Sequence, residues 1–420
     1  MTNPPRARAP FWAAFGPGLL WAATAVGVSH LVQSTRAGAD AGLGLAGVIL
    51  MALVLKYPFF EYGPRYAAAT GETLVEGYGR IGRWALWTFL LMTLSTAFMV
   101  ELAVVMFTAF LFQAALGIAL PLSMVAAFVV LGSATLLRVG RFRGLDLTIK
   151  VIMALLAIST LFAAALTLPR IDFSTLALWP PASAGVSFAF VLALAGWMPS
   201  GVDSAVWSSA WTLAKNRDTG TSASVEHALL DFRIGYVATG VLAFSFLVLG
   251  AGVMFHSGTT FSNAGTQFSL QLVELYARSL GEWTRPIVLV AVLTTMASTA
   301  LTVIDGFPRA LARTIAVIRQ TGGGAADRDA GIVYWVAMTV LGVLTVVFIA
   351  WFAFSLTALV DFATIVSFLT APILGYLNLR VVRSPFMPAA HRPGAAMVAL
   401  SWAGLVLLGG TAVVYLTSRM

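Results

Sequence analysis

Two stretches of the chain carry polar residues and helix breakers where the surrounding sequence is apolar. The first reads Gly27-Val28-Ser29-His30 and continues with Gln33, Ser34, Thr35 and Arg36. The second reads Gly196-Trp197-Met198-Pro199-Ser200-Gly201, with Asp203 and Ser204 behind it. Hydroxyl, imidazole, amide and carboxylate groups at such breaks can bind a small ion or carry a proton. Gly and Pro free backbone groups that hydrocarbon cannot satisfy, so both breaks are expected to line a cavity enclosed by protein.

The composition indicates that these breaks lie in a membrane protein. Of 420 residues, 59% are hydrophobic and only 10% are charged, and the mean hydropathy is +0.90. Too few charges remain to coat a soluble surface, and the net charge of +8 is attributed to membrane topology rather than to nucleic acid. The chain has no cysteine, four scattered histidines and no P-loop, which argues against a membrane enzyme, a thiolate metal site and an ATP-driven pump. No cofactor is expected.

Apolar segments recur at the length of about 20 residues that crosses the hydrocarbon core. A hydropathy window of about 19 residues predicts about eleven spans, at 17–38, 43–66, 86–113, 120–137, 147–168, 186–212, 234–255, 286–308, 331–350, 355–379 and 396–416. All are expected to be helices, because a helix satisfies its backbone within the segment. Between spans, 257–285 is expected to be an external loop with a short amphipathic helix, and 320–330 a flexible internal linker.

The basic residues indicate the orientation. With the N-terminus in the cytoplasm, 19 of the 25 Lys and Arg residues fall in inside loops, as the positive-inside rule requires. We therefore expect a multi-pass protein of the cell inner (plasma) membrane with a cytoplasmic N-terminus.

The two breaks lie five spans apart, so the helices that contain them cross the membrane in opposite directions. This arrangement is typical of an inverted repeat of five helices plus five, with the site at the breaks. We expect one transmembrane domain over 1–416, with repeats at about 11–168 and 186–380 and an extra helix at about 396–416. In a plainer alternative, Gly and Pro only kink these helices or allow close packing.

Several motifs resemble the Nramp family of proton-coupled divalent-metal transporters. They are Gly16-Pro17-Gly18, Gly42, Arg65 and Thr70-Gly71 through the second span, Val100-Glu101-Leu102-Ala103 in the third, Met198-Pro199 in the sixth and Val303-Ile304-Asp305-Gly306-Phe307 in the eighth. The resemblance extends over most of the chain. It implies an all-α integral membrane protein with a LeuT-type five-plus-five inverted repeat and broken helices 1 and 6.

The metal-binding motifs of the family are missing. Its Asp-Pro-Gly-Asn motif falls on Gly27-Val28-Ser29-His30, and its Met-Pro-His motif falls on Met198-Pro199-Ser200. Two acidic positions that the family uses for proton transfer fall on Thr108 and Leu111. A dication in a membrane-buried site needs anionic ligands to offset its desolvation, so a divergent member without metal transport is indicated.

We therefore expect an ion-coupled secondary active transporter, not an enzyme, whose substrate is a small inorganic anion such as bicarbonate. Helix N-termini and hydroxyl and imidazole donors suit an oxyanion, and no fixed carboxylate is expected in the site. The candidate substrate-binding residues are Gly27, Ser29, His30, Gln33, Ser34, Ala195, Met198 and Ser200. The candidate coupling or gating residues are Asp203, Glu101, Arg36 and Asp305.

Several alternatives stay open. The chain could transport a divalent cation, Mn²⁺ or hydrated Mg²⁺, with Asp203 as its anchor. His30 could donate to a carbonyl across a helix interface, and Arg36 could snorkel to the outer surface. The coupling ion could be H⁺ or Na⁺; besides these ions only the lipid bilayer is expected as a partner, with no nucleic acid.

Overall fold

The chain is almost entirely helical. A computed structural model describes residues 16–117, 119–139, 142–180, 185–220, 224–255, 261–319, 324–352 and 355–418, with the backbone alone described over 142–153, at 218 and over 324–330. No β-strand occurs in these ranges. The α-helices are α2 (Pro17–Ala25), α3 (Thr35–Ala41), α4 (Ala46–Thr70), α5 (Leu74–Ile81), α6 (Arg83–Leu116), α7 (Leu122–Val139), α8 (Phe142–Thr167), α9 (Phe188–Gly196), α10 (Ser204–Thr219), α11 (Val225–Val253), α12 (Gly265–Leu280), α13 (Arg285–Arg319), α14 (Gly324–Trp351), α15 (Leu356–Val382) and α16 (Ala395–Thr417).

Eight described helices are long and apolar enough to cross a membrane. They are α4, α6, α7, α11, α13, α14, α15 and α16, which coincide with the second to fourth and the seventh to eleventh predicted spans. The first and sixth predicted spans are each interrupted, between α2 and α3 and between α9 and α10. The fifth coincides with α8, of which Ala154–Arg170 is described as a shorter apolar helix. The chain is thus a multi-pass, all-α membrane protein; the total of eleven spans and the repeat boundaries remain predictions.

Two segments between the spans contain helices. Helix α12 lies within the stretch 257–285, where a short amphipathic helix was expected. Arg285 and Arg278 donate hydrogen bonds to Glu274 of α12 and so lower the pKa of that carboxyl. The flexible linker expected over 320–330 is wrong for its second part, because α14 begins at Gly324. Two alanines follow this glycine, and alanine has the highest helix propensity.

The halves of the first broken helix pack closely against α11. A Cβ on Gly18 would lie 2.4 Å from the Asp231 carbonyl oxygen, and one on Gly38 would lie 2.0 Å from that of Leu247. Gly250 of α11 approaches α3 equally closely, with a Cβ 2.1 Å from the Thr35 carbonyl oxygen. Since only glycine fits these contacts, α2, α3 and α11 form one backbone-to-backbone unit. Gly63 of α4 packs against α10 in the same way, with a Cβ 2.3 Å from the Ala205 carbonyl oxygen.

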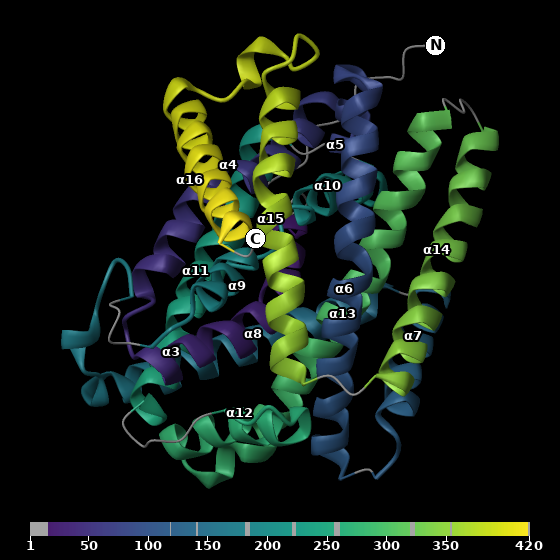
Figure 1. Ribbon diagram of the computed structural model, residues 1–420. Coiled ribbons are helices and arrows are strands. Elements are labelled where there is room, and N and C mark those ends of the chain that lie inside the picture. The colour runs from purple at the N-terminus through teal and green to yellow at the C-terminus, as the bar shows by residue number, and fades with distance from the viewer. Residues whose placement is uncertain are drawn as a thin grey trace.

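The molecule has two ends, which we name by their short helices. Figure 1 shows α5 and the connection between α15 and α16 at one end, the α5 end, while α12 lies across the other, the α12 end. The α5 end carries basic residues such as Arg80 and Arg383, as expected for the cytoplasmic side. Three of the 19 basic residues counted in the inside loops, Arg6, Arg8 and Arg141, lie outside the described residues.

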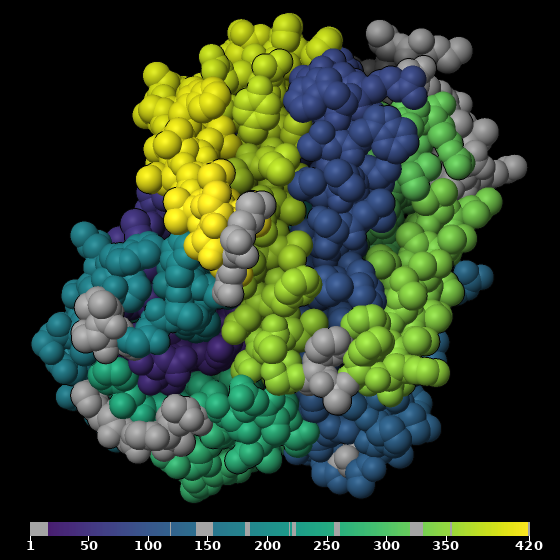
Figure 2. Space-filling model, in the orientation of Figure 1, coloured from purple at the N-terminus to yellow at the C-terminus, as the bar shows by residue number. Residues whose placement is uncertain are grey.

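Apolar side chains cover the sides of the molecule. The outer helices α14 and α16 expose large hydrophobic residues, among them Ile332, Val336, Val340, Val343, Val347, Trp402, Val406, Leu407, Val413 and Val414. Figure 2 shows α14 and α16 on this lateral surface, beside α6 and α15. A lateral surface of this composition is suited to hydrocarbon, with the broken helices inside the bundle.

Candidate functional site

The first break separates α2 from a π-helix, Ser29–Ser34, that leads into α3. Gly27 packs closely on α13, because a Cβ at this position would lie 2.8 Å from the Thr299 Cγ2 and would force that side chain to shift. In the wider π-turn, hydroxyls bond to carbonyls five residues earlier: Ser34 Oγ donates to the Ser29 oxygen at 3.4 Å, and Thr35 Oγ1 to that of His30 at 3.2 Å. The polar run that marked this break in the sequence therefore stabilises the irregular backbone.

The second break lies between the end of α9 at Gly196 and the start of α10 at Ser204. Gly196 packs against α15, where a Cβ would lie 2.0 Å from the Thr364 carbonyl oxygen. The interrupted segment contains a cis peptide bond before Pro199. Trp21 Nε1 of α2 donates to Ser204 Oγ at 3.0 Å, which ties the first broken helix to the second.

A small cavity lies between the two breaks. Its volume is about 40 Å³, and its wall is formed by Thr24, Ala25, Val28, Ser29, Val100, Val104, Trp197, Ser200, Gly201, Asp203, Trp207, Thr299, Val303 and Phe307. These residues come from both breaks and from α2, α6, α10 and α13. Since one water molecule needs about 10–15 Å³ of such volume, the cavity has room for roughly three water molecules.

A larger vestibule of about 620 Å³ opens at the α5 end. Residues of the α4–α5 connection, α5, α10 and α13 line it, including Glu72, Lys215 and Arg313. Trp207 lines both the vestibule and the small cavity. Its ring packs against Phe307, with 4.8 Å between ring centroids, so this tryptophan separates the two spaces.

Asp203 is the only carboxylate on the cavity wall in the described part of the chain. The backbone amides of Asp203 and Ser204 and the hydroxyl of Thr96 face its carboxylate. The expectation of a site without a fixed carboxylate is therefore wrong. The break extends through Asp203, because α10 begins only at the following residue.

His30 does not line the cavity. Its ring is fully buried, with Nε2 3.0 Å from the Thr239 carbonyl oxygen and Nδ1 2.7 Å from Ser29 Oγ. Both ring nitrogens thus have partners inside the protein. The structure favours the alternative in which His30 bonds to a carbonyl across a helix interface and corrects the expectation of an imidazole donor in the site.

The other expected substrate-binding residues are divided between the cavity and its surroundings. Ser29 and Ser200 lie on the wall, although the Ser29 hydroxyl also donates to the Ala25 carbonyl at 2.7 Å. Gly27 lies at the break itself. The residues that lie off the wall are Ser34, Gln33, Ala195 and the fully buried Met198.

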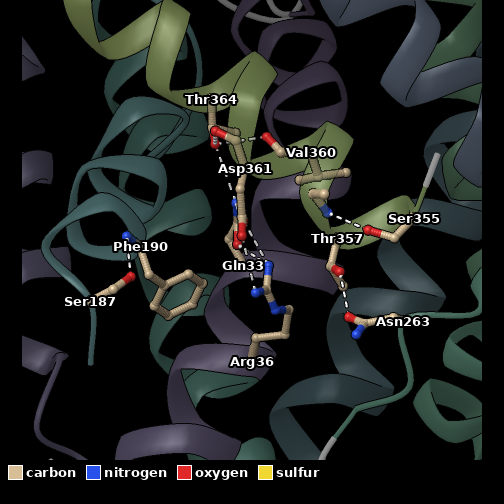
Figure 3. A network of polar contacts seen from close by, with 11 residues as sticks. Gln33, Arg36, Ser187, Phe190, Asn263, Ser355, Thr357, Val360, Asp361 and Thr364 are labelled. Carbon is tan, nitrogen blue, oxygen red and sulfur yellow. Dashed lines mark hydrogen bonds and ion pairs between the residues drawn. The ribbon is translucent and has the colours of Figure 1, made fainter. Parts of the chain in front are cut away.

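Arg36 belongs to a polar network toward the α12 end (Figure 3). It binds Asp361 of α15 through two hydrogen bonds, Nη1–Oδ1 at 2.7 Å and Nη2–Oδ2 at 3.2 Å. Gln33 Nε2 also donates to Asp361 Oδ1, at 2.9 Å, and the Arg36 guanidinium lies 4.6 Å from the centroid of the Phe190 ring. Figure 3 shows Arg36 pointing toward Asp361, so it is paired across two helices.

The remaining expected coupling residues lie apart from the cavity wall. Glu101 of α6 is buried, and neither carboxyl oxygen has a hydrogen-bond partner among the described residues. Such a carboxyl is most stable in the neutral form. Asp305 lines the vestibule, where Arg309 Nη2 donates to it at 2.6 Å and the Tyr334 hydroxyl at 2.7 Å.

Lys56 is a further residue near the site, and it is not among the residues expected from the sequence. This residue of α4 is fully buried, and its Nζ donates to three carbonyl oxygens, those of Ala195 at 3.1 Å, Gly196 at 2.9 Å and Ser200 at 2.8 Å. The Asp203 carboxylate carries the opposite charge and stabilises this ammonium. A lysine in the middle of the predicted span 43–66 was a visible signal, because an ionisable residue at that depth is functional or paired.

No protein-family model matches the sequence. Uncharacterized protein PM0681 of Pasteurella multocida is 32% identical over 416 residues, which cover 97% of this chain and 93% of that protein.

Solved structures share the fold. A manganese transporter of Eremococcus coleocola superimposes with a TM-score of 0.73 at 16% identity, covering 99% of this chain and 90% of that one. MhsT, solved in complex with L-phenylalanine, gives a TM-score of 0.61 at 15% identity over the full length of both chains. These likenesses confirm the expected LeuT-type fold, while divergent membership of the Nramp family remains a prediction. By identity and coverage, the chain belongs to the same protein family as Uncharacterized protein PM0681 of Pasteurella multocida.

Proposed function

We propose that the chain is a secondary active transporter that binds a small ion in the cavity between its two broken helices. The observation that carries this proposal is that residues of both breaks, including Ser29 and Asp203, line the same cavity. Irregular backbone at membrane depth is tolerated where it lines such a site. The fold shared with a manganese transporter supports transport as the activity.

Alternating access requires a barrier on each side of the cavity. Toward the α12 end, the pair of Arg36 and Asp361 joins α3 to α15. Toward the α5 end, Trp207, which packs against Phe307, lies between the cavity and the vestibule. We infer that the α12 end is the firmly closed side in this conformation, and that Arg36 acts as a gate rather than as a surface anchor.

A small inorganic anion, such as bicarbonate, is the substrate that we propose, with a proton as the coupling ion. When Asp203 is ionised, its charge balances that of Lys56. When Asp203 takes up a proton, the Lys56 charge is left unbalanced beside the cavity and attracts an anion. The charge of Asp203 also acts on the hydroxyl of Tyr78. Among the described residues, no cluster of three or more His, Cys, Asp or Glu side chains is suited to a metal ion.

A divalent cation is the second candidate. Two observations favour it: the Asp203 carboxylate on the cavity wall and the likeness to a manganese transporter. Against it, the fixed positive charge of Lys56 opposes a dication. A volume of about 40 Å³ also leaves no room for Mg²⁺ with its shell of water.

Proteoliposomes distinguish these substrates. Mn²⁺ influx would be followed with an internal metal-quenched dye, and bicarbonate transport through the luminal pH, for the wild type and for Asp203→Asn. Asp172→Asn, a change on an exposed loop, is the matched control, and a manganese transporter of the same fold is the positive control. The proposal expects no Mn²⁺ influx, and it expects bicarbonate transport that Asp203→Asn uncouples from the proton gradient without abolishing it. Saturable Mn²⁺ influx that Asp203→Asn abolishes would establish the second candidate instead.

A further inference from the structure

The fully buried Lys56 binds the end of α9 and the interrupted segment that follows it in the sixth predicted span. Two of its carbonyl partners, Ala195 and Gly196, are the last residues of α9. The third, Ser200, lies within the interruption. The three hydrogen bonds use all three N–H groups of the ammonium, so Lys56 has no donor left for a substrate.

The surroundings of this ammonium are those of a cation site. Carbonyl groups at a helix C-terminus lack intrahelical partners and carry partial negative charge. In transporters with broken helices, unwound carbonyls and half-helix C-termini coordinate a transported or coupling cation. Here three such oxygens lie 2.8–3.1 Å from Nζ, the carboxylate of Asp203 supplies the opposite charge, and the Phe60 ring centroid lies at 5.7 Å.

We propose that Lys56 is a covalently tethered substitute for a bound cation. Its ammonium occupies the oxygen cage at the end of α9, so neither sodium nor a metal ion loads there. Lys56 is then a specificity-determining residue that excludes cations from this break, and it holds the break together throughout the transport cycle. This inference goes beyond the proposed function, since it holds for any substrate.

Two variants of Lys56 separate the effect of its positive charge from the effect of its side-chain volume. Lys56→Ala removes the ammonium and leaves room in which a free cation can bind the carbonyl oxygens. Lys56→Met removes the charge and the donors but fills most of the same space, so it is the matched control. Lys215→Ala, at the vestibule, controls for the loss of a lysine as such.

The test is thermal unfolding of the purified proteins in choline chloride, sodium chloride and ethylammonium chloride. We expect the wild type and Lys215→Ala to unfold at the same temperature in all three salts. Lys56→Ala should unfold at a lower temperature in choline chloride and regain at least about 3 °C, saturably, with sodium or ethylammonium. Lys56→Met should be destabilised in all three salts alike. If neither cation stabilises Lys56→Ala, or if both Lys56 variants respond alike, the proposal is wrong.

A second measurement applies to the wild type and decides the matter if the variants do not fold. Radioactive ²²Na⁺ and ⁵⁴Mn²⁺ are incubated separately with the purified protein, and retention is measured at equilibrium. Absence of saturable ²²Na⁺ retention supports the tethered ammonium, whereas stoichiometric ²²Na⁺ retention refutes it. Stoichiometric ⁵⁴Mn²⁺ retention without ²²Na⁺ retention would instead contradict the proposed anion substrate, because a transported dication would bind in the cavity, so the two failures are distinguishable.

Discussion

The ion pair of Arg36 and Asp361 offers the sharpest test of the proposed gate. Asp361→Asn keeps the size of the side chain and one acceptor oxygen but removes its charge. The new amide nitrogen faces Arg36 Nη2, which now lies 3.2 Å from Oδ2, so two donors meet where a hydrogen bond existed. We expect the α12 end to open more often in this variant.

The size of the effect follows from the geometry. One charge-assisted hydrogen bond is lost, and such bonds contribute about 1.5–3 kcal/mol. The side chains of Arg36 and Asp361 are 14% and 27% exposed, so solvent weakens the pair only in part. We take about 2 kcal/mol, which corresponds to a roughly 30-fold increase in the open population.

Thiol labelling measures this population, because the chain contains no cysteine of its own. A cysteine at Thr364 is a suitable reporter, since this residue is fully buried and lies 3.3 Å from Gln33 Nε2 beneath the ion pair. A membrane-impermeant thiol reagent is added from the α12 side. The labelling rate is expected to rise about 30-fold in Asp361→Asn relative to the charged parent.

A cysteine at Leu178, which is 74% exposed, serves as the reference and should react equally fast in both backgrounds. An unchanged rate at position 364 would refute the reasoning, since the pair would then not hold the α12 end closed. Arg36→Gln combined with Asp361→Asn should raise the labelling rate little beyond the single change, because Asp361→Asn alone already breaks the interaction between the two residues.

Three further predictions concern stability. His30→Ala should cost about 3 kcal/mol in thermal unfolding, through a cavity and the lost bond to Thr239, while the KM for substrate stays unchanged; a selective rise in KM would restore His30 to the site. Asp231→Ala removes the acceptor of the Gly18 and Gly16 amides, which now donate to its carboxylate at 2.6 and 3.2 Å. This change should cost about 1–2 kcal/mol in the same assay, and a neutral result would contradict the capping role of Asp231. Glu101→Gln should change stability by less than about 1 kcal/mol, since the unpartnered carboxyl is neutral, and a large loss in thermal unfolding would reveal a charged partner.

Hydropathy and helix breakers were sufficient to predict the all-α fold and the location of both interruptions. The orientation of His30 could not be read in the same way. A π-turn begins beside it, so side chains after the break do not follow the usual helical faces. The histidine therefore points to Thr239, away from the cavity that Ser29 lines.

Lys56 was missed for a different reason. One lysine among many apolar residues barely changes the hydropathy of the span 43–66, so the window averages it away. Its partners are backbone oxygens some 140 positions further along the chain, for example Gly196. No side-chain pattern encodes such oxygens, and only the packing of α4 against the end of α9 brings them together.

The glycine contacts of α11 determine where the molecule can deform. At Gly38 and Gly250, backbone meets backbone, and neither helix can slide without a collision of main-chain atoms. On the opposite side of the cavity, branched side chains of α6 and α13, such as Val100, Val104 and Thr299, face the broken helix. Side-chain rotamers adjust more easily than main chain, so relative movement is expected on this side of the cavity. The first broken helix and α11 would then move as one rigid unit. Bulkier side chains on the α6 and α13 side should slow this movement without weakening the contact between the broken helix and α11.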